Sequence, residues 1–219
     1  MKCVRRFPQS IDAWPSLDAL LGAVRACRAC EAHLPLGPRP VLQAHEMARI
    51  LVVGQAPGLR VHETGIPWND ASGERLRAWM GIDPPTFYDA SRIAIVPMGY
   101  CYPGRGSGGD LPPRPECARL WLEPVLARLP RIELTLLIGV HAQRHFLGAR
   151  RQPTLAKTVA HWERYAPSWL PLPHPSPRNQ PWLGRHPWFE RELLPVLRAR
   201  VERILAQTAS HSASRPQAA

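Results

Sequence analysis

Short apolar runs alternate with longer segments of helical periodicity along this chain, and this alternation most strongly limits its possible folds. The runs that we expect to form strands cover residues 47–53, 92–98, 133–139 and 169–172. The segments that we expect to form helices cover residues 16–32, 70–80, 115–129, 141–147 and 188–205. Strands that alternate with helices form a mostly parallel sheet covered on both faces. We therefore predict an α/β fold whose strands end at one common edge.

The length of the chain fits one domain. At 219 residues it can bury a full hydrophobic core, whereas two domains would be crowded. We assign residues 1–206 to a single domain and predict a disordered tail over residues 207–219, which are small and polar. No segment is long and apolar enough to span a membrane, and the first residues lack the apolar core of a signal peptide. The expected location is the cytoplasm, in association with the nucleoid.

Positive charge is in large excess. The chain has 28 Lys and Arg residues against 17 Asp and Glu, for a formal net charge of +11. Nearly all of this charge is arginine, which binds phosphate through a bidentate fork and stacks on bases. A codon bias would explain arginine in place of lysine, but it would not explain the excess over acids. The balance indicates DNA, single- or double-stranded, as the partner. No protein partner is evident, and we expect a monomer.

Two loops of unusual composition follow predicted strands that are far apart in sequence. Gly54–Gly58, with the sequence Gly-Gln-Ala-Pro-Gly, follows the first strand. His174–Asn179, with the sequence His-Pro-Ser-Pro-Arg-Asn, follows the last. Parallel α/β folds bind ligands where the carboxyl ends of their strands meet. We therefore expect Gln55 and His174 to face each other across one pocket of a size suited to a small planar substrate.

The cysteines form two candidate pairs. Cys27 and Cys30 are a Cys-x-x-Cys pair at the end of the first predicted helix, Cys101 and Cys117 come later, and Cys3 stands apart. Disulfides are rare in the cytoplasm, where clustered cysteines more often bind a metal. Four thiolates suit either a tetrahedral zinc ion or a [4Fe–4S] cluster, and the spacing does not distinguish the two. Alternatively, each cysteine is a small buried apolar side chain and binds no metal.

In the order of these motifs the chain resembles the uracil-DNA glycosylase superfamily, and most closely its family 4, the iron–sulfur type. That family has a Cys-x-x-Cys pair, a Gly-Glu-x-Pro-Gly loop, a Pro-Phe-x-Gly-x-x-Gly segment, two further cysteines and a late His-Pro-Ser motif. The matching elements here are Cys27/Cys30, Gly54–Gly58, Pro67–Gly73, Cys101/Cys117 and His174–Asn179. The late motif is similar to the His-Pro-Ser-Pro-Leu form of families 1 and 5. The resemblance implies a three-layer α/β/α sandwich with a short, mostly parallel central sheet, and a [4Fe–4S] cluster on the four cysteines.

The resemblance also implies a reaction. An enzyme of this kind flips a base out of the DNA stack, holds it flat, recognises it and cleaves its glycosidic bond. Gly54, Gln55 and Ala56 would line the base pocket. Trp68 matches the Phe that stacks on the flipped base, although an indole at this position could equally pack in the core. His174 matches the histidine that donates a hydrogen bond to the base oxygen on which negative charge develops.

The late loop would contact DNA. Arg178 lies where relatives carry a leucine that enters the duplex, and an arginine there could fill the gap and contact phosphate or the orphan base. Ser176, together with Pro177 and Asn179, would bind a backbone phosphate. The glycine-rich segment 104–110 has no helical or strand pattern. We expect a flexible loop there that approaches the DNA backbone, or a plain surface loop.

Several catalytic positions of the relatives carry other residues here. Family 1 has an Asp at the position of Ala56 to orient the attacking water, and family 4 has a Glu where Gln55 stands. An amide cannot act as a general base. The remaining carboxylate is Asp70, which matches the Asp of an Asp-x-Ser-Gly segment in family 5 and is also a good helix N-cap. The catalytic candidates are His174, Asp70 and Gln55, with His62 and Glu63 in reserve for positioning water.

Specificity is affected by Pro97, which stands where the relatives have an asparagine that reads uracil, because proline offers no side-chain hydrogen bond. Uracil, hypoxanthine, xanthine and other damaged bases therefore remain possible substrates. The predicted function is a DNA N-glycosylase, a hydrolase of base excision repair that removes a deaminated base. The alternative is a non-catalytic DNA-binding protein of the same fold, which the changes at Gln55 and Pro97 favour. The residues Trp68, Asp70 and His174 favour the enzyme.

Overall fold

The computed structural model describes residues 14–212, with side chains to Gln207, so that Cys3 lies outside the described residues. Its central feature is a four-stranded sheet with the strand order β2-β1-β5-β6, in which every pairing is parallel. The strands are β1 (Ile50–Val53), β2 (Ile93–Ile95), β5 (Leu134–Ile138) and β6 (Trp169–Leu172). Each lies within a predicted strand, and the last has the predicted bounds.

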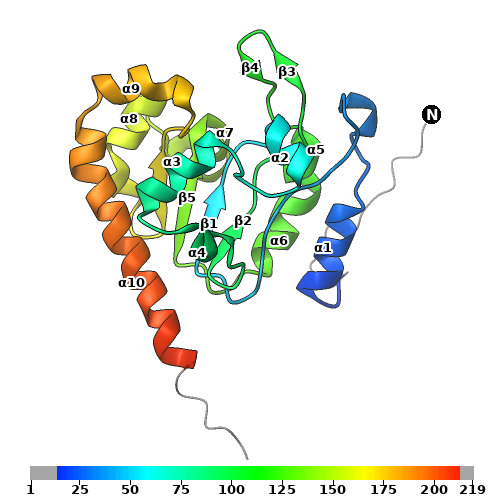
Figure 1. Ribbon diagram of the computed structural model, residues 1–219, viewed down its shortest axis with the longest axis horizontal. Helices are drawn as coiled ribbons and strands as arrows, with labels where there is room; N and C mark the ends of the chain where they lie inside the picture. Colours follow the sequence, from blue (N-terminus) through cyan, green and yellow to red (C-terminus); the bar gives the residue numbers. More distant parts are fainter. Residues whose placement is uncertain (1–13, 213–219) are drawn as a thin grey trace, which may run out of the picture.

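The strands are apolar, with Thr135 of β5 as the exception, because helices cover both faces of the sheet. All residues of β1, β2 and β5 are buried. On one face, Leu51 and Val53 pack against α1 (Leu17–Arg25), α6 (Glu123–Ala127) and α7 (Gly139–Leu147). On the other face, Ile50 and Val52 pack against α3 (Ala71–Met80), α4 (Pro84–Tyr88), α8 (Leu155–Ala160) and α10 (Leu194–Ser212). The result is the predicted three-layer α/β/α sandwich (Figure 1).

The first helix is shorter than predicted. Ser16 caps α1 by accepting a hydrogen bond from the backbone N–H of Ala19 at 3.2 Å, as Ser at an N-cap does. The helix ends at Arg25 because its buried stripe ends at Val24, and not at residue 32. Cys27 and Cys30 therefore follow the helix, in a turn that leads into a short 3₁₀ helix over Glu31–His33.

Two predicted helices contain a π-helical turn just before a proline. Residues 115–127 run as α5 (Pro115–Cys117), a π turn at Ala118–Leu122 and then α6. The closing helix likewise begins with a π turn at Phe189–Leu193 and continues as α10. Pro124 and Pro195 lack the N–H of a regular helix and crowd the preceding turn, and the wider π turn makes room for the ring. α10 runs to Ser212 and thus into the predicted tail, whose residues 213–219 lie outside the described part.

The segment predicted as a flexible or plain loop is a β-hairpin. β3 (Arg105–Gly106) pairs antiparallel with β4 (Gly109–Asp110). Gly104 and Gly109 have φ angles of 99° and 136°, which glycine adopts without the strain that a side chain would add. The prediction was wrong because this short ribbon depends on turn geometry and has no alternating pattern. In Figure 1 the hairpin projects from the end of the molecule toward which β1 points.

Short helices that the sequence analysis did not predict are α2 (Leu59–Thr64) and α9 (Gln180–Arg185), together with α4 and α8. α2 directly follows the Gly54–Gly58 loop, and α9 directly follows the His174–Asn179 loop. None of the described helices is long and apolar enough to cross a membrane.

Candidate active site and cysteine group

A pocket of about 440 Å³ lies at the carboxyl ends of the strands, and we call it the strand-end pocket. Its size falls in the range of small-molecule sites. The loop after β1 and the His174 loop both line it, as expected. The predicted site residues in its lining are Gly54, Gln55, Ala56, Trp68, Asp70, His174, Ser176 and Arg178. The remaining non-cysteine candidates, Pro177, Asn179, His62 and Glu63, are not among the described residues that line it.

His174 is held as a neutral imidazole. Its Nδ1 accepts a hydrogen bond from the backbone N–H of Ser176 at 3.2 Å, so the ring proton resides on Nε2. Enclosure by protein lowers the pKa of His174, and this outweighs the negative charge of Asp70, which acts in the opposite direction. The residue therefore presents an N–H donor, without a positive charge, at physiological pH.

A buried side-chain amide holds the strand ends from which the His174 loop starts. Gln143 of α7 is 1% exposed, and its Nε2 donates to the carbonyl of Leu137 at 3.2 Å and to that of Leu172 at 2.9 Å. These carbonyls lie near the ends of β5 and β6. Asn179 fixes the loop from its other side, since its Nδ2 donates to the carbonyl of His174 at 2.7 Å. Asn179 thus has a structural role here, which the sequence analysis did not assign to it.

Replacing Gln143 with leucine is expected to destabilise the fold by about 1–3 kcal/mol, because two buried carbonyls lose their donor. Chemical denaturation followed by circular dichroism measures this change. The control is Gln180→Leu at the exposed start of α9, where a change within about 0.5 kcal/mol is expected. Equal effects of the two substitutions would contradict the anchoring role of Gln143.

Trp68 is placed by an unusual backbone and by two glycines. Its φ is 56°, in the left-handed region, where a tryptophan is strained. A Cβ on Gly54 would lie 2.8 Å from the indole, and a Cβ on Gly73 would lie 1.7 Å from the carbonyl oxygen of Trp68. The indole lies near His174, with ring centroids 5.7 Å apart and planes inclined by 32°. Trp68 also packs against the core, so both roles considered for it are compatible with its position.

Asp70 both caps a helix and lines the pocket. Its Oδ1 accepts a hydrogen bond from the backbone N–H of Gly73 at 2.8 Å, which makes it the N-cap of α3. Its Oδ2 lies 4.0 Å from the position of a Cβ on Gly58. One carboxylate oxygen therefore holds the helix, while the other lies beside the loop that follows β1.

Another part of the pocket lining is apolar. Val41, Ile95 and Pro97 contribute to it, at the end of β2 and in the segment before β1. Pro97 is thus in the pocket, where the resemblance places a base-reading asparagine, but it brings no hydrogen-bonding side chain. Tyr102 also lines this pocket and supplies a hydroxyl that the sequence analysis did not consider.

The hairpin forms a wall of the pocket that sequence reasoning missed. Its residues Arg105, Gly108, Gly109 and Asp110 are all in the lining. Arg178 connects it to the late loop, because its Nη1 donates to the carbonyl of Gly108 at 3.4 Å. The sequence placed this segment near DNA but contained no signal that its aspartate would lie at the pocket.

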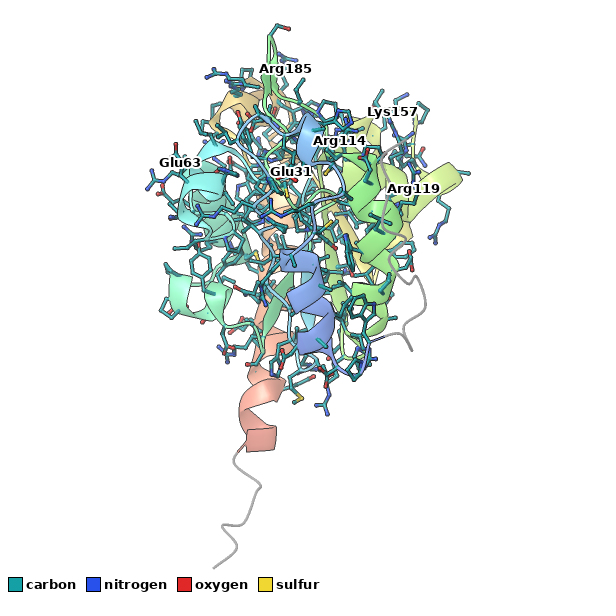
Figure 2. All side chains as sticks on the ribbon, turned by 90° about the vertical axis from the view of Figure 1, so that its right-hand side faces the viewer. Glu31, Glu63, Arg114, Arg119, Lys157 and Arg185 are labelled. Atoms are coloured by element: carbon teal, nitrogen blue, oxygen red, sulfur yellow. The ribbon has the colours of Figure 1, made fainter. Side chains whose placement is uncertain are left out.

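The four cysteines predicted as ligands are all buried, and they lie near enough to influence one another's pKa, Cys30 with Cys117 and Cys101 with Cys30 and Cys27. Contact with the Cys117 thiol, which can donate a hydrogen bond, lowers the pKa of Cys30 to about 7. Burial raises the pKa of Cys101 to about 11, and the nearby Cys30 and Cys27 add to this effect. Figure 2 views the side that carries α1 and labels Glu31 and Arg114, which are charged neighbours of these cysteines along the chain. We call this set of four residues the cysteine group.

Protein N–H donors point at two of the sulfurs. The Trp121 indole N–H lies 3.3 Å from the Cys27 sulfur, and the backbone N–H of Tyr100 lies 3.5 Å from that of Cys117. The Tyr100 hydroxyl is buried and has no hydrogen-bond partner among the described residues. Within residues 14–212, no three or more His, Cys, Asp or Glu side chains are arranged to hold a single metal ion. Four buried thiols, with N–H donors directed at two of the sulfurs, are a donor set that suits a thiolate-bound metal centre.

One comparison with known proteins identifies the family. The model of the uracil DNA glycosylase superfamily matches residues 43–198, well over half of the chain. The match spans the sheet, both pocket loops and the hairpin, and it begins after Cys27 and Cys30. With the three-layer sandwich and the pocket at the strand ends, this match shows that the chain belongs to the uracil DNA glycosylase superfamily.

Proposed function

We propose that this protein is a DNA N-glycosylase that removes a deaminated base from DNA by hydrolysis. The observation that carries the proposal is the pairing of Trp68 with a neutral His174 inside one pocket of about 440 Å³. An indole gives a flipped base a flat stacking surface. A neutral imidazole gives it an N–H donor without introducing a buried charge beforehand.

The reaction would use these groups in the following way. When the bond between the sugar C1′ and the base nitrogen breaks, negative charge develops on the base. The Nε2–H of His174 would stabilise this charge, because its position is fixed by the Ser176 and Asn179 hydrogen bonds. Asp70 would orient the attacking water with the oxygen that does not cap α3. Gln55 would contact the flipped nucleobase through its side-chain amide. An amide cannot accept a proton from water, so Gln55 would not act as the general base.

DNA would be bound beside this pocket by residues of the His174–Asn179 loop. Arg178 is exposed and lies next to Ser176, whose hydroxyl accepts a hydrogen bond from the Arg178 backbone N–H at 3.3 Å. The guanidinium of Arg178 donates to the hairpin carbonyl of Gly108 at 3.4 Å. Because a guanidinium has five N–H groups, Arg178 could hold this carbonyl and a phosphate at the same time. The net charge of +11 would add attraction for the DNA backbone.

We further propose that the cysteine group holds a [4Fe–4S] cluster, with Cys27, Cys30, Cys101 and Cys117 as its ligands. When bound, such a cluster would provide an electron-transfer centre and a covalent link between segments that are distant in sequence. The cluster would join the turn after α1 to the two ends of the segment that carries the hairpin. The superfamily match starts at residue 43, so it does not cover the first two ligands.

Protein that is purified without oxygen and reconstituted with iron and sulfide is expected to be brown. Thiolate-to-iron charge transfer should give it a broad absorbance band at about 400 nm. Replacing Cys117 with serine should abolish this band and lower the thermal stability. Zinc in stoichiometric amount and no colour would contradict the cluster. Iron and zinc analysis of the same sample distinguishes the two metals.

The test of the enzymatic proposal is an excision assay. Labelled oligonucleotides that contain uracil, hypoxanthine, xanthine or a normal base are incubated with the protein and then cleaved with alkali at abasic sites. We expect cleavage of at least one deaminated substrate and none of the normal control. Pro97 in the pocket predicts weaker discrimination among these bases than an amide would give.

The competing function is DNA binding without catalysis, which the replacement of relatives' residues by Gln55 and Pro97 favours. Under it, the protein would bind DNA with a steep dependence on salt concentration and would leave every modified base intact. Measuring binding by fluorescence anisotropy on the oligonucleotides of the excision assay separates the two functions. Binding with no excision of any base would overturn the enzymatic proposal.

A further inference from the structure

A second carboxylate faces the strand-end pocket in addition to Asp70. Asp110 belongs to β4 of the hairpin, and it lines the pocket. Its Oδ2 lies 3.4 Å from the position that a Cβ on Gly58 would take, and the Oδ2 of Asp70 lies 4.0 Å from the same point. Both carboxylates therefore lie over the loop that follows β1, on the side of the pocket lined by Gly58.

The hairpin has enough internal support to hold Asp110 in place. Asp110 pairs with Arg105 across the ribbon, and Gly106 pairs with Gly109. The backbone N–H of Leu111 donates to the carbonyl of Gly104 at 2.9 Å, which closes the base of the hairpin. The bond from Arg178 to the Gly108 carbonyl ties the tip to the late loop. The ribbon is thus fastened at both ends, and its aspartate lies between them.

The two carboxylates differ in how their oxygens are used. Asp70 commits Oδ1 to the N-terminus of α3, where it accepts the Gly73 N–H at 2.8 Å. Asp110 caps no helix. Partial burial raises the pKa of Asp110, and the charge of Asp70 adds to this, while Arg178 and Arg105 act in the opposite direction. A carboxylate with a raised pKa is a stronger base once it is ionised.

We propose that Asp110 is a catalytic residue, the general base that takes a proton from the attacking water. This inference rests on the proposed glycosylase function. The C1′–N bond breaks, and its electron pair leaves with the base, which accepts a hydrogen bond from His174. The water oxygen forms the new bond to C1′, and one of its protons passes to the Asp110 carboxylate. Asp70 orients the water before this attack, and afterwards the proton on Asp110 passes to solvent or to the departing base.

The inference accounts for the replacement of the relatives' carboxylates at Ala56 and Gln55. The general base that the loop after β1 lacks would be supplied by the hairpin, whose Asp110 Oδ2 lies 3.4 Å from the position of a Cβ on Gly58. The reaction requires an ionised Asp110. Excision should therefore be fast above the pKa of Asp110 and be lost as the pH falls through it. Because this pKa is raised, the loss begins at a higher pH than an ordinary aspartate would give.

The experiment compares single-turnover excision rates of wild type, Asp110→Asn and Asp110→Glu across pH, on whichever base the wild type removes. Asp110→Asn should slow excision by about 10²-fold or more and remove the acidic limb of the profile. Asp110→Glu should restore part of the rate. The control is Asp18→Asn at the exposed start of α1, which removes the same charge far from the pocket. Affinity for an abasic-site oligonucleotide should be unchanged or higher in Asp110→Asn, because the arginines around it lose a negative neighbour.

Three results would overturn the inference. One is an Asp110→Asn rate equal to that of the wild type, and another is an acidic limb that persists in this variant. The third is that Asp110→Asn has no effect in an Arg178→Ala background, because Asp110 would then act only by holding that arginine. A wild-type protein that removes no base at all is a different outcome. It would overturn the proposed function, and the role of Asp110 would fall with it.

Discussion

Base excision is expected to slow by about 10²- to 10³-fold when His174 is replaced by alanine, the usual cost of losing one preorganised donor to a developing negative charge. Ser176 fixes the ring so that Nε2 carries the proton, and enclosure lowers the pKa of the imidazole. The donor is therefore present without needing protonation. Single-turnover kinetics on the preferred oligonucleotide measures the loss directly.

The control for this variant is His161→Ala. His161 is exposed, and its Nδ1 hydrogen bonds locally to the Lys157 carbonyl at 2.8 Å, so its removal should leave excision unchanged. His174→Gln gives a finer test, since a side-chain amide can replace one N–H donor and should recover part of the rate. Full activity of His174→Ala would contradict the assigned role, and so would a loss of equal size in His161→Ala.

The second large effect is expected from Gly73→Ala. A methyl group there would lie 1.7 Å from the carbonyl oxygen of Trp68, far inside van der Waals contact and against backbone. Either the start of α3 or the Trp68 backbone must shift. A shift of Trp68 would also disturb the hydrogen bonds that its carbonyl accepts from Arg77 at 3.3 Å and from Tyr88 at 3.5 Å. We expect a loss of about 3 kcal/mol in the free energy of unfolding, at the upper end for overpacking. Urea denaturation measures it.

The matched control is Gly22→Ala. Gly22 lies in the interior of α1 with no atom within 4 Å of an added Cβ, so the same substitution should stabilise the protein by about 0.5–1 kcal/mol. Opposite signs for the two variants would establish that the Trp68 contact is the cause. If Gly73→Ala keeps both wild-type stability and wild-type excision, then Trp68 is not held by this glycine.

The predicted helices and strands succeeded where the burial pattern was unambiguous. The apolar runs of β1, β5 and β6 are buried strands, and Asp70 caps α3, because both features depend on residues adjacent in sequence. The first helix was extended too far, through Cys27 and Cys30, because cysteine is apolar enough to continue a helical pattern. The short helices α2 and α9 were missed because each is only six residues long and interrupts a loop.

The site was predicted in part for similar reasons. Residues that follow strands, such as Gln55 and His174, necessarily come to the strand-end edge of a parallel sheet, so their meeting could be expected. Asn179 was assigned to DNA, but its amide holds the His174 carbonyl. That bond depends on how the loop turns back on itself, and residue order does not specify this turn.

By itself, the sequence determined the α/β class, the parallel sheet and the edge where the pocket lies, because hydrophobic periodicity and strand–helix alternation are local properties. Only the tertiary structure decided that a glycine-rich hairpin closes this pocket and brings Asp110 over Gly58 beside Asp70. It also decided that four cysteines from three separate segments bury their sulfurs near one another. The physical reason is that such contacts depend on the directions in which loops leave the sheet. Packing of the whole chain sets those directions, and no local pattern records them.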